Sequence, residues 1–183
     1  MSLFLILAEL EADIDLHLGR LLVLMGAFAG RKGEGEIRGL TKLAKLDFLL
    51  RYPLFLERAL TARAVTKPAN IGMQDYERLS VESRMVRFKY GPWDFRYRRL
   101  INILVARGLV HVDMASRTVS LSLTSKGMEA AQRLSSTREY ADIRSRARLL
   151  RQHFDIQGTK LMRFVYQTFP EITTLRFGEE IAP

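Results

Sequence analysis

The sequence of 183 residues contains no cysteine. A disulfide framework, a thiolate metal site and a cysteine nucleophile are therefore excluded. Histidine is nearly as scarce, because only His17, His111 and His153 are present and they lie far apart in the sequence. Imidazole and thiolate are the main protein ligands of zinc, copper and iron, so such a metal has few candidate ligands here. We expect neither a metal nor another cofactor.

Long apolar runs are also missing. The longest uncharged apolar stretch, Leu21 to Gly30, is well short of the ~20 residues that span a bilayer. Met1 to Leu10 has no basic residue ahead of its apolar residues, which is unlike a secretory signal peptide. The 48% hydrophobic and 27% charged residues are ordinary for a globular protein. We expect a cytoplasmic protein that makes no contact with a membrane.

Positive charge is in excess and is unevenly distributed. The chain has 29 Lys and Arg against 20 Asp and Glu, which gives a net charge of +9. The first 30 residues contain four acids and one base, a net charge of −3, whereas residues 84–151 contain fifteen bases and five acids, a net charge of +10. Such a segment favours a nucleic acid or an acidic protein as partner. A solvated surface with internal ion pairs would give the same counts.

Apolar periodicity predicts helices along most of the chain. The expected helices cover residues 14–29, 40–52, 54–64, 92–107, 124–134, 139–154 and 158–169. Thr41 is expected to cap the second of these helices. The run Gly91-Pro92-Trp93-Asp94 is expected to begin the fourth, because proline suits the first helical position. Residues 65–80 are expected to form a loop.

Alternation with a period of two predicts strands. Met85–Tyr90 alternates weakly, and Val110–Met114 and Val119–Leu123 alternate on either side of a short polar turn, which is typical of a β-hairpin. The order of helix, helix, short strand, helix, hairpin and helix is that of a winged helix. We therefore expect a mainly α protein with a small β-hairpin wing and a winged helix-turn-helix core with flanking helices. The expected parts are an N-terminal helix and Gly-rich connector at 1–38, the core at 39–135 and a C-terminal helical extension at 136–183.

The sequence offers little support for catalysis. No serine lies in a Gly-x-Ser-x-Gly elbow. The glycine cluster at 30–39 lacks the Gly-Lys-Ser/Thr ending of a phosphate-binding loop. The acidic pairs Glu34/Glu36 and Glu179/Glu180 lie in polar segments, where water would leave their carboxylates untuned for acid–base chemistry. We expect a chain that is not an enzyme.

Two groups of polar residues are candidates for binding nucleic acid or a partner. The helix at 92–107 has the position of the recognition helix of a helix-turn-helix, and part of its surface would face outward. Basic residues just before it would hold phosphates, which fix orientation rather than sequence preference. A second group lies on the basic helix at 139–154. The candidate residues are Arg84, Arg87, Lys89, Arg98, Arg99, Asn102, Arg144, Arg148 and Arg151.

Other interpretations of these segments stay open. Asp94 lies four residues before Arg98 and would be able to pair with it along a helix. Phe95 in an outward position suits a protein contact better than a DNA groove, and Trp93 suits the core better than a base-stacking platform. The apolar tail at 161–169 would either dock onto a partner or fold back onto its own chain. Nucleic-acid contact and protein contact are therefore both open for the helix at 92–107.

Two stretches resemble a known family. The run from Arg84 through Lys89-Tyr90-Gly91-Pro92-Trp93-Asp94 to Val110, together with Gly39–Pro53 upstream, is similar to the middle component of bacterial ABC-three-component systems. Lamassu-type antiphage and antiplasmid systems belong to that group. The resemblance covers residues 14–170, and the Lys-Tyr-Gly-Pro-Trp-Asp run is its most specific part.

The resemblance implies a small, non-catalytic accessory subunit of an antiviral defence complex. Its partners would be an SMC-like or Rad50-like ATPase with long coiled coils and a nuclease-type effector. DNA sensing would belong mainly to the ATPase, while basic surfaces of this chain help to hold double-stranded DNA. The alternative is a dimeric winged-helix transcriptional regulator, because Leu123-Thr124-Ser125-Lys126-Gly127 resembles the corresponding run of MarR- and PadR-type regulators.

Overall fold

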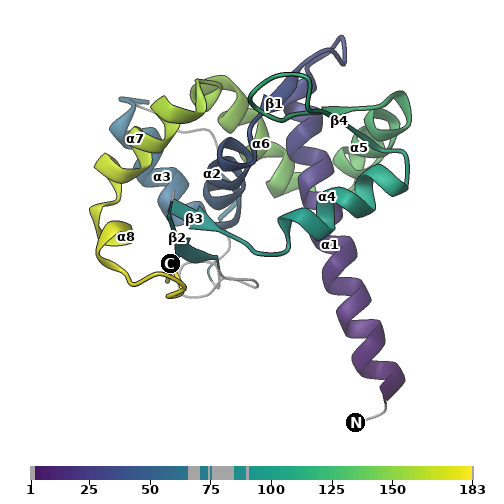
Figure 1. Ribbon diagram of the computed structural model, residues 1–183, viewed down its shortest axis with the longest axis horizontal. Coiled ribbons are helices and arrows are strands. Elements are labelled where there is room, and N and C mark those ends of the chain that lie inside the picture. The colour runs from purple at the N-terminus through teal and green to yellow at the C-terminus, as the bar shows by residue number, and fades with distance from the viewer. Residues whose placement is uncertain (1–2, 66–70, 74, 76–84, 90, 183) are drawn as a thin grey trace.

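The computed structural model describes residues 3–65, 71–73, 75, 85–89 and 91–182, with the backbone alone for 3–13 and 88. This part of the chain forms eight helices and five short strands (Figure 1). In chain order they are α1 (Leu3–Ala29), β1 (Glu36–Arg38), α2 (Leu40–Arg51), α3 (Pro53–Ala62), β2 (Val86–Phe88), β3 (Gly91–Trp93), α4 (Tyr97–Ala106), β4 (Val110–Asp113), β5 (Ser120–Leu123), α5 (Ser125–Ser136), α6 (Ala141–Phe154), α7 (Gly158–Thr168) and α8 (Pro170–Thr174). Among these helices, none combines the length and the apolar character needed to cross a membrane.

The larger sheet has three antiparallel strands in the order β1-β5-β4. The expected hairpin is confirmed, with Val110 opposite Leu123. β1 was not expected, because three residues are too few for a period-two pattern; it pairs Ile37 with Leu121. Strands β2 and β3 form a separate antiparallel pair. The product is a mostly helical molecule with a small antiparallel sheet.

Helix α1 connects most of the molecule. Its C-terminal half packs against α4, α5 and α6, and every residue from His17 to Met25 is buried. Two glycines on this half allow the close packing. A Cβ at Gly19 would collide with the Tyr140 hydroxyl, and one at Gly26 would lie 3.0 Å from Ala131 Cβ. Figure 1 shows the N-terminal half of α1 extending beyond the other described elements.

An aromatic cluster joins α2 and α3 to the C-terminal part of the chain. The rings of Phe48 and Phe55 lie 5.0 Å apart, and Phe55 and Phe169 are equally close. Leu161 and Val165 of α7 are also fully buried. Of the two interpretations of the apolar tail, the structure therefore has the tail folded back onto its own chain. Pro170 follows the end of α7, as expected, and it also begins α8.

Two expected helix starts are wrong. Helix α4 begins at Tyr97 rather than Pro92, because Gly91–Trp93 forms a strand opposite β2. Proline is tolerated there since β3 is an edge strand of its pair. Thr41 does not cap α2: the residue before that helix is Gly39, with φ of 94° and no side-chain cap. Most of the loop expected at 65–80 lies outside the described residues, which include only 65, 71–73 and 75 of it.

The end of the β4–β5 hairpin leads directly into α5. The Thr124 hydroxyl accepts a hydrogen bond from Gly127 N at 3.0 Å and donates one to the Gly108 carbonyl at 2.7 Å. Lys126 Nζ donates to the Arg107 carbonyl at 2.9 Å. A Cβ at Gly127 would collide with the Leu109 carbonyl. The Leu-Thr-Ser-Lys-Gly run therefore fixes α5 against the end of α4.

Candidate functional site

Helix α4 has one buried face and one polar, exposed face. Its buried residues are Tyr97, Leu100, Ile101 and Leu104. Arg98, Arg99 and Asn102 are exposed and point away from this core, as periodicity predicted. Within the described part of the chain, none of these three side chains has a hydrogen-bond or ion-pair partner. We call Arg98, Arg99 and Asn102 the outer face of α4.

Apolar side chains flank this outer face. Phe95, two residues before α4, is 64% exposed, and Val105 near its end is 41% exposed. Exposed aromatic and aliphatic groups beside arginine are typical of protein interfaces. The expected alternative in which Asp94 pairs with Arg98 is wrong, because Asp94 pairs with Arg51 and Arg96 instead. Arg98 is therefore available to a partner.

The predicted basic residues ahead of α4 belong to another surface. Arg84 lies outside the described residues. The guanidinium of Arg87 lies 4.3 Å from the centre of the Phe177 ring, and the Arg87 backbone is hydrogen-bonded to Gly178 and Glu179. Lys89 is exposed. The β2 residues are thus associated with the C-terminal segment rather than with the outer face of α4.

The arginines of α6 differ in the hydrogen bonds and ion pairs that they make within the protein. Arg144 donates to the Ser135 carbonyl, and Arg151 forms an ion pair with Asp155. Arg146, which is 3% exposed, donates to the carbonyls of Ile71 and Gly72 at 2.8 and 2.6 Å. Arg148 is exposed and has no hydrogen bond or ion pair to another described residue. Some arginines of α6 therefore stabilise the fold, while Arg148 leaves its positive charge on the surface.

Arg144 and Arg148 line a groove of about 720 Å³ between α1, α5 and α6. Its other lining residues include Arg31 just after α1 and the small residues Gly26 and Ala27 within α1.

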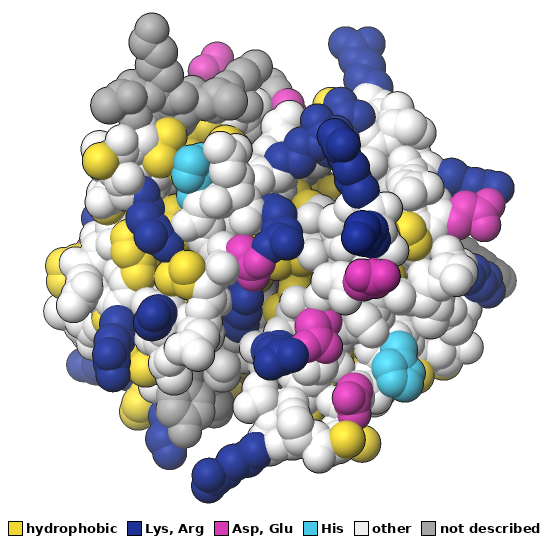
Figure 2. Space-filling model, turned by 90° about the horizontal axis from the view of Figure 1, so that it is seen from above, with side chains coloured by type: hydrophobic (Ala, Val, Ile, Leu, Met, Phe, Trp, Pro, Cys, Tyr) yellow, Lys and Arg dark blue, Asp and Glu magenta, His cyan; other side chains and the backbone are white. Residues whose placement is uncertain are grey.

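On the face in Figure 2, Lys and Arg side chains are spread over the surface and several lie beside Asp or Glu. That face therefore shows interleaved charges rather than one continuous basic area.

A buried charge network fixes the start of α4. Asp47 of α2 is fully buried and accepts hydrogen bonds from Arg20 Nε at 2.7 Å, Arg51 Nε at 2.9 Å and the Tyr97 hydroxyl at 2.7 Å. Arg51 Nη2 also lies 2.9 Å from Asp94 Oδ2. The network thus joins α1, α2 and the first residue of α4 through buried side chains, of which Asp47 and Tyr97 have no exposed surface.

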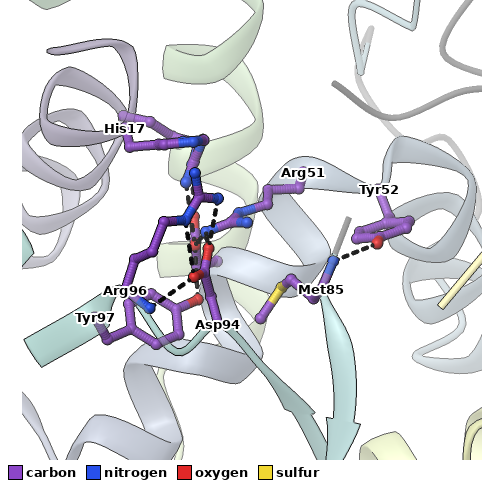
Figure 3. Close-up of polar contacts among 9 residues, drawn as sticks. His17, Arg51, Tyr52, Met85, Asp94, Arg96 and Tyr97 are labelled. Carbon is purple, nitrogen blue, oxygen red and sulfur yellow. Dashed lines mark hydrogen bonds and ion pairs between the residues drawn. The ribbon is translucent and has the colours of Figure 1, made fainter. Parts of the chain in front are cut away.

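Figure 3 shows His17, Arg51 and Tyr97 directed toward this shared centre, with Asp94 and Arg96 at its edge. His17 Nδ1 lies 2.6 Å from Arg20 Nη1. Because a guanidinium only donates, His17 Nδ1 accepts this bond. The Asp94 carboxylate accepts from the backbone N–H of Arg96 at 2.9 Å and from its guanidinium at 2.9 Å.

The electrostatics of the network keep both carboxylates ionised. Burial of Asp47 would raise its pKa, but the charges of Arg20 and Arg51 outweigh burial and hold this pKa well below its usual range. Burial opposes ionisation of Asp94 too, yet hydrogen bonds from Arg96 and the charge of Arg51 lower its pKa to about 2. Burial raises the pKa of Tyr97, so this hydroxyl keeps its proton. The network is a fixed arrangement of charges at neutral pH.

Within the Lys-Tyr-Gly-Pro-Trp-Asp run, residues 91–94 lead directly to this network. Gly91 has φ of 104°, in a region that favours glycine. Pro92 pairs with Arg87, and the Trp93 ring lies edge-on to Tyr97 with the centroids 5.3 Å apart. Asp94 then enters the ion pairs. The most specific part of the resemblance therefore has a clear role in the fold.

Sequence reasoning missed the buried charges. Asp47 and Arg51 have opposite charges four residues apart within the apolar run Leu46–Arg51, and that pattern was the available signal. No local signal identified Arg20 or Arg146, whose partners lie 27 and 75 residues away.

Comparison of the chain with protein-family models, with curated proteins and with solved structures finds no match. What the site can do is therefore inferred from its own geometry. Among the described residues, no three His, Asp or Glu side chains form a group that could hold a metal ion. The arrangement provides an exposed mixed surface on α4 and a rigid support beneath it.

Proposed function

We propose that the chain is a non-catalytic accessory subunit with a winged-helix core. Its role is to dock onto an SMC-like or Rad50-like ATPase, to assist DNA engagement by that ATPase and to help control a nuclease-type effector. In chain order, α1, β1 and α2 are followed by α3 and the β2–β3 pair and then by α4, β4 and β5. Apart from the inserted α3, β2 and β3, this order supports the winged-helix part. In that fold the strand between the first two helices joins the hairpin after the recognition helix, and β1 pairs with β5 here.

The outer face of α4 is the observation that carries the proposal. Arg98 and Arg99 are exposed beside Phe95 and Val105. A helix that enters a DNA groove would place these apolar groups against phosphates and water, whereas a protein partner would bury them. Arginine and aromatic residues are enriched among the side chains that dominate binding energy at protein interfaces. The face therefore suits a protein partner first and DNA second.

The buried network supports the same role. Tyr97 and Asp94 hold the start of α4 to Asp47 and Arg51 of α2. A docking face built on a rigid element loses little conformational entropy when it binds. The class of partner follows from the resemblance of the Lys-Tyr-Gly-Pro-Trp-Asp run and its flanks, and the basic surfaces are consistent with an ATPase that works on DNA.

Affinity purification of the tagged full chain from its native host, followed by mass spectrometry, tests the proposal. We expect a coiled-coil ATPase to be retained at about 0.5 M salt. Ion pairs on exposed surfaces are strongly screened at that concentration, so retention there would not be due to general charge attraction. The double variant Arg98→Ala/Arg99→Ala should reduce recovery of this ATPase at least tenfold. The matched variant Lys160→Ala/Arg163→Ala, which removes two exposed charges from α7, should leave recovery unchanged. Recovery of the chain without any ATPase contradicts the proposal.

The alternative of a winged-helix transcriptional regulator also has a specific observation in its favour. Arg98, Arg99 and Asn102 are the residue types that read guanine and adenine edges in the major groove. A regulator should form a symmetric dimer and protect a pseudo-palindromic site with half-sites about one helical turn apart. Selection of sites from a random duplex library decides this point, since an assembly subunit should enrich no sequence.

A further inference from the structure

The groove between α1, α5 and α6 carries positive charge that no acid in its walls compensates. Arg31, Arg144 and Arg148 line it, and no Asp or Glu is among its described lining residues. Within the described part of the chain, Arg31 and Arg148 have no hydrogen-bond or ion-pair partner. Arg144 uses one of its N–H donors on the Ser135 carbonyl, which leaves others for a ligand. Three neighbouring cations without an acid attract an anionic partner.

Helix α6 runs beside α1 in the same direction. Just before α6, the Tyr140 hydroxyl lies where it would collide with a Cβ at Gly19. Near the end of α6, the guanidinium of Arg151 lies 5.7 Å from the centre of the Phe28 ring. Positions on α6 and on α1 therefore advance together along the groove.

The three arginines are spaced along this direction. Arg144 and Arg148 are about one turn apart on the same side of α6, a rise of about 6 Å. Arg31 follows the end of α1, further along the groove. In an extended peptide every second side chain points the same way, and such side chains are about 6.6 Å apart. Acidic residues at alternate positions of an extended peptide therefore match the spacing of the first two arginines and continue toward the third.

The other walls suit the rest of such a peptide. Ala27 and Met128 are partly buried and offer apolar surface, whereas Gln132 offers an exposed amide. The floor is closed by Gly26 and Ala131, because a Cβ at Gly26 would lie only 3.0 Å from Ala131 Cβ. A ligand therefore lies along the groove and does not insert a side chain between α1 and α5.

The helix ends beside the groove favour separated carboxylates over a compact phosphate. Ala27 lies in the last turn of α1, and Ser135 and Ser136 lie in the last turn of α5. The C-terminus of a helix carries partial negative charge, which opposes a dense group of phosphate charges more than carboxylates spread along a chain. No aromatic side chain is among the described lining residues, so a nucleic-acid base finds no stacking surface there.

We propose that the groove binds an extended acidic segment of a partner protein, with acidic residues at alternate positions. The carboxylates pair with Arg144, Arg148 and Arg31, and the intervening side chains lie against the α5 wall at Met128 and Gln132. This inference does not rest on the accessory-subunit proposal, because the groove contains no residue of the outer face of α4.

Fluorescence anisotropy with a labelled synthetic peptide tests the inference. The probe Gly-Glu-Val-Glu-Val-Glu-Gly should bind the full chain saturably, with a dissociation constant no weaker than about 1 mM. Arg31→Ala/Arg148→Ala should weaken binding at least about fivefold, because charge-assisted hydrogen bonds to two carboxylates are lost. Lys160→Ala/Arg163→Ala lowers the net charge equally on α7 and should leave binding unchanged. Absence of saturation, or equal losses for the two double variants, overturns the inference. Circular dichroism checks that each variant is folded.

A second peptide tests the spacing of the acids. Gly-Glu-Glu-Glu-Val-Val-Gly has the same composition and charge, but only two of its glutamates point the same way in an extended chain. We expect it to bind more weakly than the first probe, and equal affinities would mean general charge attraction and refute the proposed site. Inorganic triphosphate that binds more tightly than the first probe, and loses this affinity in Arg31→Ala/Arg148→Ala, would assign the groove to phosphates instead.

Two further variants locate the peptide. Arg98→Ala/Arg99→Ala should leave its binding unchanged, so that failure of this inference and failure of the accessory-subunit proposal are told apart. The absence of cysteine permits disulfide trapping. The peptide Gly-Glu-Cys-Glu-Val-Glu-Gly should form a mixed disulfide with Gln132→Cys several times faster than with the exposed control Lys160→Cys. Equal rates would show that the peptide does not lie in the groove.

Discussion

Asp47 neutralises two buried guanidinium groups at once. Asp47→Asn keeps the shape of the side chain but leaves Arg20 and Arg51 without their shared carboxylate. Breaking a buried ion pair from one side costs about 3–5 kcal/mol, so we expect a loss of this size in the free energy of unfolding. Urea denaturation followed by circular dichroism measures it. Glu36→Gln, which removes the exposed partner of Arg38, should cost less than about 1 kcal/mol. Similar losses for both variants would refute a central role for Asp47.

Lys45 is a buried cation whose hydrogen bond goes to the Thr41 carbonyl at 3.1 Å. Burial lowers its pKa to about 8. The unfolded chain therefore binds this proton more tightly, and stability rises with pH between about 8 and 10.5. We expect Lys45→Met to be the more stable protein at pH 7, by about 2–3 kcal/mol, with the difference shrinking toward pH 10. Urea denaturation across this range measures it, and a constant difference would show that the charge of Lys45 is not the cause.

Residue positions could be predicted from the sequence where they depend on local periodicity. The outward positions of Arg98, Arg99 and Asn102 follow from the 3.6-residue repeat of α4. The partners of Asp47 could not be predicted, because Arg20 and Tyr97 reach it from 27 and 50 residues away. Pairings of that kind are decided by tertiary packing, which a single sequence does not encode locally.

Among the helices and strands, too, those with a repeated local pattern could be predicted and the short ones could not. Long amphipathic helices such as α5 and α6 and the β4–β5 hairpin were predicted within a few residues, because several turns or a full alternation repeat the signal. The short strands β1 and β3 were missed. Each has three residues, too few for a period-two signal. β1 is a strand because the distant β5 supplies its hydrogen bonds, whereas β3 pairs with the neighbouring β2. Pro92 strengthened the error, since it suits a helix start as well as an edge strand.

The N-terminus of α5 gives a prediction at the scale of an element. Thr124 caps the helix and also ties it to the end of α4 through the Gly108 carbonyl. Thr124→Ala should lower the free energy of unfolding by about 1–2 kcal/mol, because an N–H of the first turn loses its partner. Thr61→Ala is the control: its hydroxyl bonds back to Glu57 within an exposed helical turn, so its loss should be nearly neutral. Urea denaturation measures the free energy of unfolding of both variants. Equal losses in the two would contradict the capping role of Thr124.

At the scale of the whole molecule, one core includes the C-terminal half of α1 and the C-terminal segment of the chain. Leu18 of α1, Val165 of α7 and Ile181 near the C-terminus belong to the same buried cluster. The Tyr52 hydroxyl donates to the Ile181 carbonyl at 2.9 Å. It also accepts from Met85 N at 2.9 Å (Figure 3). The C-terminal segment therefore supports the β2–β3 pair, which in turn positions the start of α4.

Charge is also organised over the whole molecule. Residues 1–15 contain four acids and no Lys or Arg, so the remaining residues carry +13 and the whole chain +9. We expect weak, sequence-independent binding of a 30-base-pair duplex that falls with salt. Arg98→Ala/Arg99→Ala should reduce the slope of log affinity against log salt by about 1.8, at about 0.9 for each phosphate that an arginine no longer neutralises. Fluorescence anisotropy between about 50 and 200 mM salt measures this slope. Lys160→Ala/Arg163→Ala should leave it unchanged, and an equal reduction would mean that DNA binds the general basic surface rather than α4.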